Sequence, residues 1–140
     1  MAYVMQLKQH DIPGMDRILN VSKKVGPHPD CVNAVGDVEA VQRLVAAGCR
    51  KYAGNHGFGL PMPTGKLDAL TGFYIFESQY KRQSTGAPGT VIDGCVSPAH
   101  GVAYGGGVWT IVQLNAYAFS YDRAAWEAIL SRFAGNAPGS

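Results

Sequence analysis

The pattern of apolar and polar positions predicts helices in several stretches of the chain. In residues 37–50, Val38, Val41 and Val45 recur at helical spacing and form one apolar face. Asp37 is a suitable N-cap, because its carboxylate can accept hydrogen bonds from the free N–H groups of a first helical turn. We therefore expect a helix that begins at Asp37 and buries its valine side.

The same periodicity predicts further helices over residues 67–83, 108–118 and 122–133. Residues 67–83 are apolar on more than one side, so we expect this helix to be the most buried element. Asp122 is the expected N-cap of the final helix. That helix places a row of large apolar side chains on one face: Trp126, Ile129, Leu130 and Phe133.

Strand signals are few and short. Residues 2–7 (AYVMQL) form a possible strand and residues 15–19 (MDRIL) a short amphipathic turn, with Pro13-Gly14 as a turn between them. Residues 53–66 are rich in glycine and proline, which predicts irregular structure, and residues 90–94 (TVIDG) could form a short strand.

These patterns predict a mainly α fold, a small bundle of three to four helices with long Gly/Pro loops and minor strand. The chain of 140 residues suffices for one compact domain. We expect an N-terminal extension at 1–20, a single helical domain at 21–134 and a disordered tail at 135–140.

Composition and charge narrow the possible partners. The net charge of +2 gives no basic surface of the kind that nucleic-acid-binding proteins carry, so no nucleic-acid partner is expected. No apolar run reaches the roughly 18 residues that span a bilayer, so we expect no membrane insertion. The N-terminus lacks the features of a secretory signal. We expect synthesis in the cytoplasm, and export by a route that reads no such signal stays open.

Three segments, in order, resemble a known family. They are VGPHPDCVNAVGDVEAVQRLVAAG at 25–48, TGFYIFESQ at 71–79 and VIDGCVSPAHGVAYGGGVWTIVQLN at 91–115. They are similar to the glycine-containing loop and DVxxVQxLL helix, the TxxAIxxFQ helix and the DGxVxPGGxTxxxLN close of helical peptidoglycan-binding domains. The polar matches include Asn33, Asp37, Gln42, Thr71, Gln79, Asp93, Thr110 and Asn115.

The chain also departs from that family pattern. Tyr74 stands where the family has Ala, and Ser78 where it has Phe. The insert HGFGLPMP and the long loop AHGVAYGGG are not typical of the family. The resemblance covers residues 21–116. It implies a peptidoglycan-binding-domain-like helical bundle that acts as a non-catalytic cell-wall binding module, for instance in a phage or a bacterial secretion or lysis system.

A wall-glycan groove needs aromatic faces for sugar rings and polar groups for acetamido and carboxyl groups. The candidate ligand-binding residues of suitable type are Tyr80, Lys81, Arg82, Gln83, Asp93 and Tyr104. The alternative is that Tyr80 packs under a loop while Lys81 and Arg82 merely solvate a helix end. A protein-binding adaptor built on the same fold is a second functional hypothesis.

A third hypothesis is a cysteine-dependent peptidoglycan amidase. Cys31 could act as its nucleophile, with His56 or His100 as the base. Against it, such enzymes place the cysteine in the first turn of a helix and the histidine on a sheet, and this sequence offers little sheet. Glu77 is the carboxylate most suited to an acid role, because it lies on an otherwise apolar helix. On balance we expect no enzymatic activity.

The cysteines give no sign of a metal or disulfide framework. There are three, an odd number, and no CxxC pair. Cys95 and His100 resemble a metal-ligand spacing only loosely, since a zinc site needs further ligands. We therefore expect no metal and no cofactor. Cys49 is expected to be a small buried apolar residue.

Overall fold

The computed structural model of the chain describes residues 1–8, 12–101, 103, 104 and 106–138, and it is mainly helical, as predicted. The helices are α1 (Val35–Gly48), α2 (Arg50–His56), α3 (Ala69–Ser84), α4 (Thr110–Tyr121) and α5 (Arg123–Phe133). The strands β1 (Tyr3–Gln6) and β2 (Arg17–Asn20) pair antiparallel with Tyr3 opposite Asn20, and β3 (Ala103–Tyr104) pairs with β4 (Gly107–Val108).

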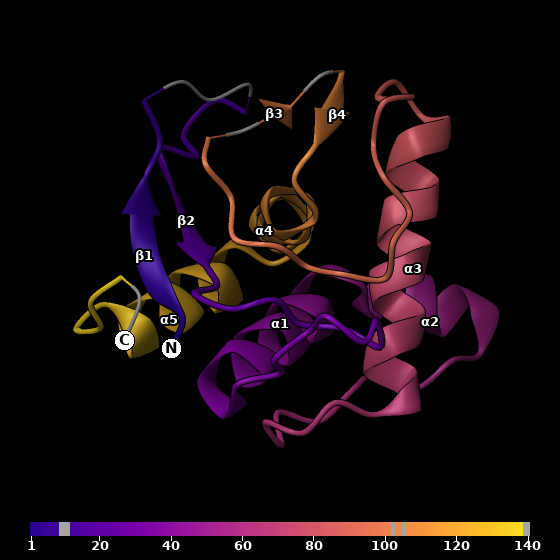
Figure 1. The fold of residues 1–140 in the computed structure, drawn as a ribbon, viewed down its shortest axis with the longest axis horizontal. Coiled ribbons are helices and arrows are strands. Elements are labelled where there is room, and N and C mark those ends of the chain that lie inside the picture. Colours follow the sequence, from indigo (N-terminus) through magenta and orange to yellow (C-terminus); the bar gives the residue numbers. More distant parts are fainter. Residues whose placement is uncertain (9–11, 102, 105, 139–140) are drawn as a thin grey trace.

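Helix α4 lies at the centre of the molecule, seen end-on in Figure 1, and it contacts α1, α3, α5 and β2. Its inner side is apolar, and Ile111, Leu114 and Ala118 are fully buried. Each buried large aliphatic side chain contributes about 1.5–3 kcal/mol to folding. The prediction that the helix over 67–83 is the most buried element is wrong, because α1 and α4 bury larger shares of their residues than α3 does. Phe76 and Tyr80 on α3 are 42% and 64% exposed.

Close packing of α1 on α4 depends on Gly48. A Cβ atom at Gly48 would lie 2.6 Å from Cβ of Tyr117 and 2.7 Å from the backbone nitrogen of Ala118. Such distances are well inside van der Waals contact. Glycine therefore sets how closely the two helices approach.

Aspartates cap the N-termini of two helices, and a third aspartate joins helix α1 to the loop that precedes it. The predicted cap at Asp122 is confirmed, since its carboxylate accepts from Ala125 N at 3.1 Å, and Asp68 caps α3 in the same way. The predicted cap at Asp37 is wrong, because α1 begins at Val35. Asp37 is instead fully buried and accepts from the backbone N–H groups of Ser22 and Lys23, both at 3.1 Å.

Three local predictions are also wrong. The expected turn at 15–19 is largely strand β2, because it pairs with β1 and because Leu19 donates one hydrogen bond to Asn115 of α4 and accepts another from it. The expected irregular segment at 53–66 begins as helix α2, which ends at Gly57 with a left-handed φ of 69°. Residues 90–94 form no strand, and Thr90 instead accepts a hydrogen bond from Val108 N at 3.1 Å.

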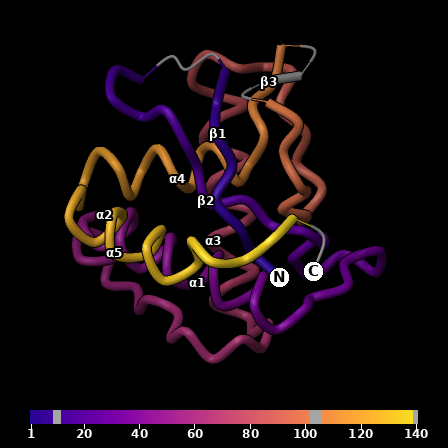
Figure 2. Tube along the Cα trace, turned by 90° about the vertical axis from the view of Figure 1, so that its left-hand side faces the viewer, coloured from indigo at the N-terminus to yellow at the C-terminus, as the bar shows by residue number. Residues whose placement is uncertain are grey.

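The N-terminal hairpin shares the core of the helices. Ile18 and Leu19 on β2 are fully buried in the same apolar cluster as α1 and α4. Beyond α5, the Asn136 amide donates to the Ala2 carbonyl at 2.9 Å, and the two ends of the chain lie side by side (Figure 2). The described residues before 21 and after 134 therefore include ones that contact the body of the protein.

Candidate functional site

The polar residues that carry the family resemblance are mostly buried and bonded to the chain's own loops. The Gln79 amide donates to the Cys95 carbonyl at 2.9 Å and accepts from Gly94 N at 3.0 Å. The Gln42 amide donates to the Lys66 carbonyl at 2.9 Å and accepts from Gly65 N at 3.0 Å. Each glutamine thus binds one loop by both of its amide atoms.

Asn115 does the same for the N-terminal hairpin. Its amide accepts from Leu19 N and donates to the Leu19 carbonyl, both at 2.9 Å, and it also accepts from the Trp126 indole at 3.0 Å. It is fully buried. We call Gln42, Gln79 and Asn115 the loop-binding amides. Because both ends of each amide already have protein partners, their role is to hold the fold.

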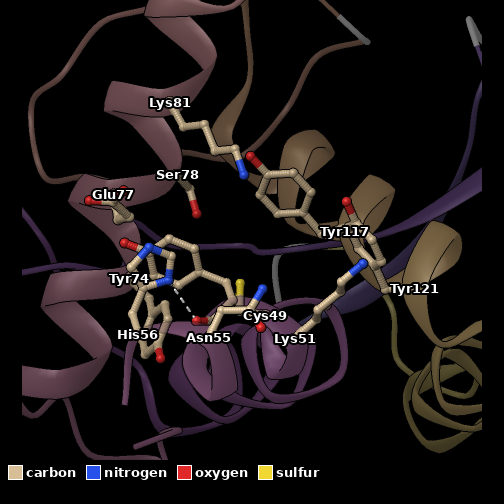
Figure 3. Close-up of a pocket in the computed structure, with 12 residues that line it drawn as sticks. Cys49, Lys51, Asn55, His56, Tyr74, Glu77, Ser78, Lys81, Tyr117 and Tyr121 are labelled. Carbon is tan, nitrogen blue, oxygen red and sulfur yellow. Dashed lines mark hydrogen bonds between the residues drawn. The ribbon is translucent and has the colours of Figure 1, made fainter. Parts of the chain in front are cut away.

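A separate, open feature lies between the end of α1, α2, α3 and α4. It is a cavity of about 260 Å³, which we call the aromatic groove. Its side chains come from four helices, as Figure 3 shows for most of them. The lining residues are Gly48, Cys49, Lys51, Tyr52, Asn55, His56, Tyr74, Glu77, Ser78, Lys81, Tyr117 and Tyr121.

Lys81 reaches across the groove from α3 toward α4 (Figure 3). Its Nζ lies 5.7 Å from the ring centre of Tyr117 and 5.8 Å from that of Tyr52. Both distances are within cation–π range. The ammonium group is therefore held between two aromatic side chains.

The α2 side of the groove is a stack of rings. The His56 imidazole lies 4.2 Å from the Tyr52 ring, nearly parallel to it, and its Nδ1 is 2.9 Å from the Tyr52 carbonyl. The Phe58 ring follows at 6.2 Å from both. The Tyr74 ring is 1% exposed, and its hydroxyl donates to the Gly59 carbonyl at 2.7 Å. These contacts fix flat apolar faces at the groove.

Burial and nearby charge keep the groove's weak acids protonated. Burial raises the pKa of the Tyr52, Tyr74 and Tyr117 phenols, and a hydrogen bond with Glu77 adds to the increase for Tyr52. Burial also raises the pKa of the Cys49 thiol to about 11, against a smaller opposing effect of Lys81. At neutral pH the phenols are hydrogen-bond donors, and Cys49 is a thiol and not a thiolate nucleophile.

A second hollow, of about 310 Å³, adjoins the groove. Tyr117 and Tyr121 line both cavities, and Arg82 lines only the second. The Nε atom of Arg82 is buried and has no hydrogen-bond partner among the described residues. The two tyrosines of α4 therefore separate a hollow with Lys81 from a hollow with Arg82.

The structure separates the six predicted ligand-binding residues. Lys81 lines the aromatic groove and Arg82 the adjoining hollow, whereas Tyr80 projects from α3 and is 64% exposed. Gln83 donates to the Thr90 carbonyl at 2.9 Å, and Asp93 accepts from the Gln79 amide and Cys95 N. The Tyr104 side chain lies outside the part of the chain that the structure describes.

The three predicted catalytic candidates lie in different surroundings. The Cys31 thiol contacts the Cys95 thiol, His56 lies in the ring stack, and His100 meets Trp109 edge-on at 5.6 Å between ring centres. Among the described residues, no hydrogen bond joins Cys31 to an imidazole. Within the described lining of the groove, Glu77 is the only carboxylate, whereas glycoside hydrolysis generally uses two.

Sequence reasoning missed most of the groove. Tyr52, Asn55 and His56 come from α2, in and beside a segment that its glycines marked as irregular. The third helix was predicted to end at 118, whereas α4 continues to Tyr121. The sequence therefore did not indicate that Tyr121 lies one helical turn after Tyr117. A usable signal was the i, i+4 spacing of two aromatic pairs, Tyr52 with His56 and Tyr117 with Tyr121.

Within the described residues, the helices are all too short or too polar to cross a bilayer. Comparisons of the chain with protein-family models, with characterised proteins and with solved structures gave no match. The resemblance to helical peptidoglycan-binding domains therefore stays a prediction, which rests on the three segments of sequence.

Proposed function

We propose that the chain is a non-catalytic module that binds bacterial cell-wall peptidoglycan, and that the aromatic groove is its glycan site. One observation carries the proposal: Lys81 is held between the rings of Tyr52 and Tyr117 in an open cavity. The groove thus presents aromatic faces and a cation together, and peptidoglycan offers sugar rings beside carboxylates.

The chemistry of the lining suits such a ligand. The apolar C–H face of a sugar ring packs on an aromatic side chain, and the Tyr117 and Tyr121 rings are available on α4. The ammonium groups of Lys51 and Lys81 complement the carboxylates of the lactyl group and the stem peptide. The Asn55 amide and the Tyr121 hydroxyl, which also line the groove, supply partners for acetamido groups.

The adjoining hollow supports a polymeric ligand over a small one. Because Tyr117 and Tyr121 line both cavities, a glycan strand can cross them with one sugar on each side. Arg82 would then meet a second carboxylate, beyond the one that Lys81 meets. The positive groups of the two cavities thus match the spaced negative charges of a wall strand.

The same side chains are better suited to binding a glycan than to catalysing its cleavage. The pKa of Cys49 is raised to about 11, so the thiol in the groove is not ionised at neutral pH. Glu77 interacts with the Tyr52 phenol and has no second carboxylate beside it within the described lining. These features support a binding module over an amidase or a glycosidase.

Sedimentation with purified sacculi tests the proposal. The wild-type protein should co-sediment, and Tyr117→Ala and Lys81→Met should each weaken binding about ten-fold, from the loss of a ring face or of a cation. Tyr80→Ala is the matched control, because it removes an exposed tyrosine of α3 outside the groove. Circular dichroism establishes that each variant is folded.

Two results would overturn the proposal. In the first, the folded wild-type protein stays in the supernatant at all sacculus concentrations. In the second, Tyr80→Ala weakens binding as much as Tyr117→Ala does, which would move the site to the outer face of α3.

A further inference from the structure

Two of the three cysteines lie in contact, although an odd number of cysteines predicts no disulfide framework. Cys31 Sγ and Cys95 Sγ are 2.8 Å apart, and both are free thiols. Cys31 lies in the loop before α1, and Cys95 lies in the segment between α3 and β3. Cys49, the third cysteine, is buried at the aromatic groove.

The backbones that carry the two thiols are joined next to the contact. Val25 and Val96 form an antiparallel bridge, with N–H···O distances of 3.1 and 2.7 Å. Gly26 and Gly94 meet so closely that a Cβ at Gly26 would lie 1.8 Å from the Gly94 carbonyl oxygen. Both glycines have positive φ values, 151° and 70°, which side-chain-bearing residues rarely adopt.

Side chains hold each of the two segments in place. The Asn33 amide accepts from Gly26 N at 2.8 Å and donates to the Gly26 carbonyl at 3.0 Å, which closes the loop around Cys31. On the other side, the Gln79 amide donates to the Cys95 carbonyl, and Asp93 accepts from Cys95 N, both at 2.9 Å. The contact between the thiols therefore follows from fixed backbones on both sides.

We propose that Cys31 and Cys95 are a site of reversible oxidation at which an intramolecular disulfide forms. Oxidation breaks the two S–H bonds and forms one S–S bond. The two electrons and two protons pass to a disulfide oxidant such as oxidised glutathione, which is reduced to two molecules of its thiol. This inference does not depend on wall binding, and it concerns a different part of the molecule.

The surroundings of the pair predict how fast it reacts. Burial, together with the hydrogen bond to Cys95, raises the pKa of Cys31 to about 12. The thiolate is the attacking species, so the reaction is slow at neutral pH and faster in alkaline solution.

The bond would tie the loop before α1 to the segment after α3. It joins residues that are 64 positions apart, and closing so long a loop restricts the unfolded chain. Oxidised protein should therefore melt about 10 °C above reduced protein. Cys31→Ser should abolish this difference, and Cys49→Ala should leave it intact.

The test uses the full chain, incubated with oxidised glutathione at pH 8.5, blocked with an alkylating agent in denaturant and digested. We expect a peptide pair joined through Cys31 and Cys95, with Cys49 alkylated, and loss of the pair on reduction. The proposal is overturned if Cys31 and Cys95 are both recovered alkylated, if they carry only glutathione, or if either is joined to Cys49. Sedimentation with sacculi reports separately on wall binding.

Discussion

The loop-binding amides and the Lys81 ammonium of the aromatic groove differ in what their polar atoms contact. Asn115 is fully buried, both of its amide atoms are bonded to the Leu19 backbone, and its oxygen also accepts from the Trp126 indole. In the groove, the Lys81 ammonium lies between two rings at an open cavity. Buried, satisfied polar groups fix a structure, whereas open ones are free to meet a ligand.

This difference separates two kinds of sequence signal. Gln42, Gln79 and Asn115 match the family pattern; the two glutamines hold loops to helices, and Asn115 holds strand β2 to α4. Tyr117 and Tyr121 lie outside that pattern and line the groove. Because the resemblance depends on the amides, it predicts the fold. It does not predict the groove, which is identified from the structure.

The largest expected effect is the loss of stability when one of the loop-binding amides is replaced. Asn115→Leu should lower the free energy of unfolding by about 4 kcal/mol, because it leaves the Leu19 backbone and the Trp126 indole without partners in the core. Urea denaturation measures the change. Ser120→Ala, on the exposed side of the same helix, should cost less than about 0.5 kcal/mol. If Asn115→Leu were as stable as the wild type, the structural role proposed for this amide would be contradicted.

Gly48 has a structural role beside the groove, since it lies where α1 packs on α4 and also lines the groove. Gly48→Ala should destabilise the protein by about 2 kcal/mol, because the new Cβ would push α1 away from α4. Gly54→Ala is the matched control: it has open space around it in α2 and should stabilise by up to about 1 kcal/mol. Thermal unfolding of both variants checks the contrast, and a stabilised Gly48→Ala would contradict the packing.

The groove should also make stability depend on alkaline pH. The folded-state pKa of Cys49 is about 11, above its ordinary value of 9.0. Its contribution is therefore fully present below pH 9 and is lost as the pH rises through 11, because the unfolded chain ionises first. Under reducing conditions, Cys49→Ala should lose about 2 kcal/mol less than wild type between pH 8 and 11. Identical pH profiles would show that Cys49 is not buried at the groove.

The smallest effect concerns a residue predicted to bind the ligand. Gln83→Ala should cost about 0.5 kcal/mol, because its amide holds the Thr90 carbonyl, and it should leave binding to sacculi unchanged. Chemical denaturation and sedimentation are measured on the same preparation. A variant with unchanged stability and weakened binding would assign Gln83 to the ligand after all.

Periodicity and capping predicted the long helices well, because their signals are local. The apolar spacing of Val38, Val41 and Val45 and the cap at Asp122 each depend on residues within a few positions. Asp37 shows the limit of such reasoning. Its carboxylate caps no helix, because two N–H groups of a loop some 14 residues earlier compete for it.

The groove was less predictable because it depends on how helices are placed in space. Of the six predicted ligand residues, Lys81 lines the groove and Arg82 the adjoining hollow, whereas Asp93 is bonded to Gln79 and Cys95. The contact of Cys31 with Cys95 likewise follows from a meeting of glycines 68 positions apart, at Gly26 and Gly94, that no local pattern reveals.

The most direct test is to map soluble peptidoglycan fragments onto the backbone amide resonances of the folded protein by NMR titration. We predict shifts concentrated at residues 48–56, 74–81 and 117–121, with the side-chain amides of Gln42, Gln79 and Asn115 unmoved. Shifts centred on those three amides, or no shifts at saturating fragment, would contradict the division between a structural amide network and a binding groove.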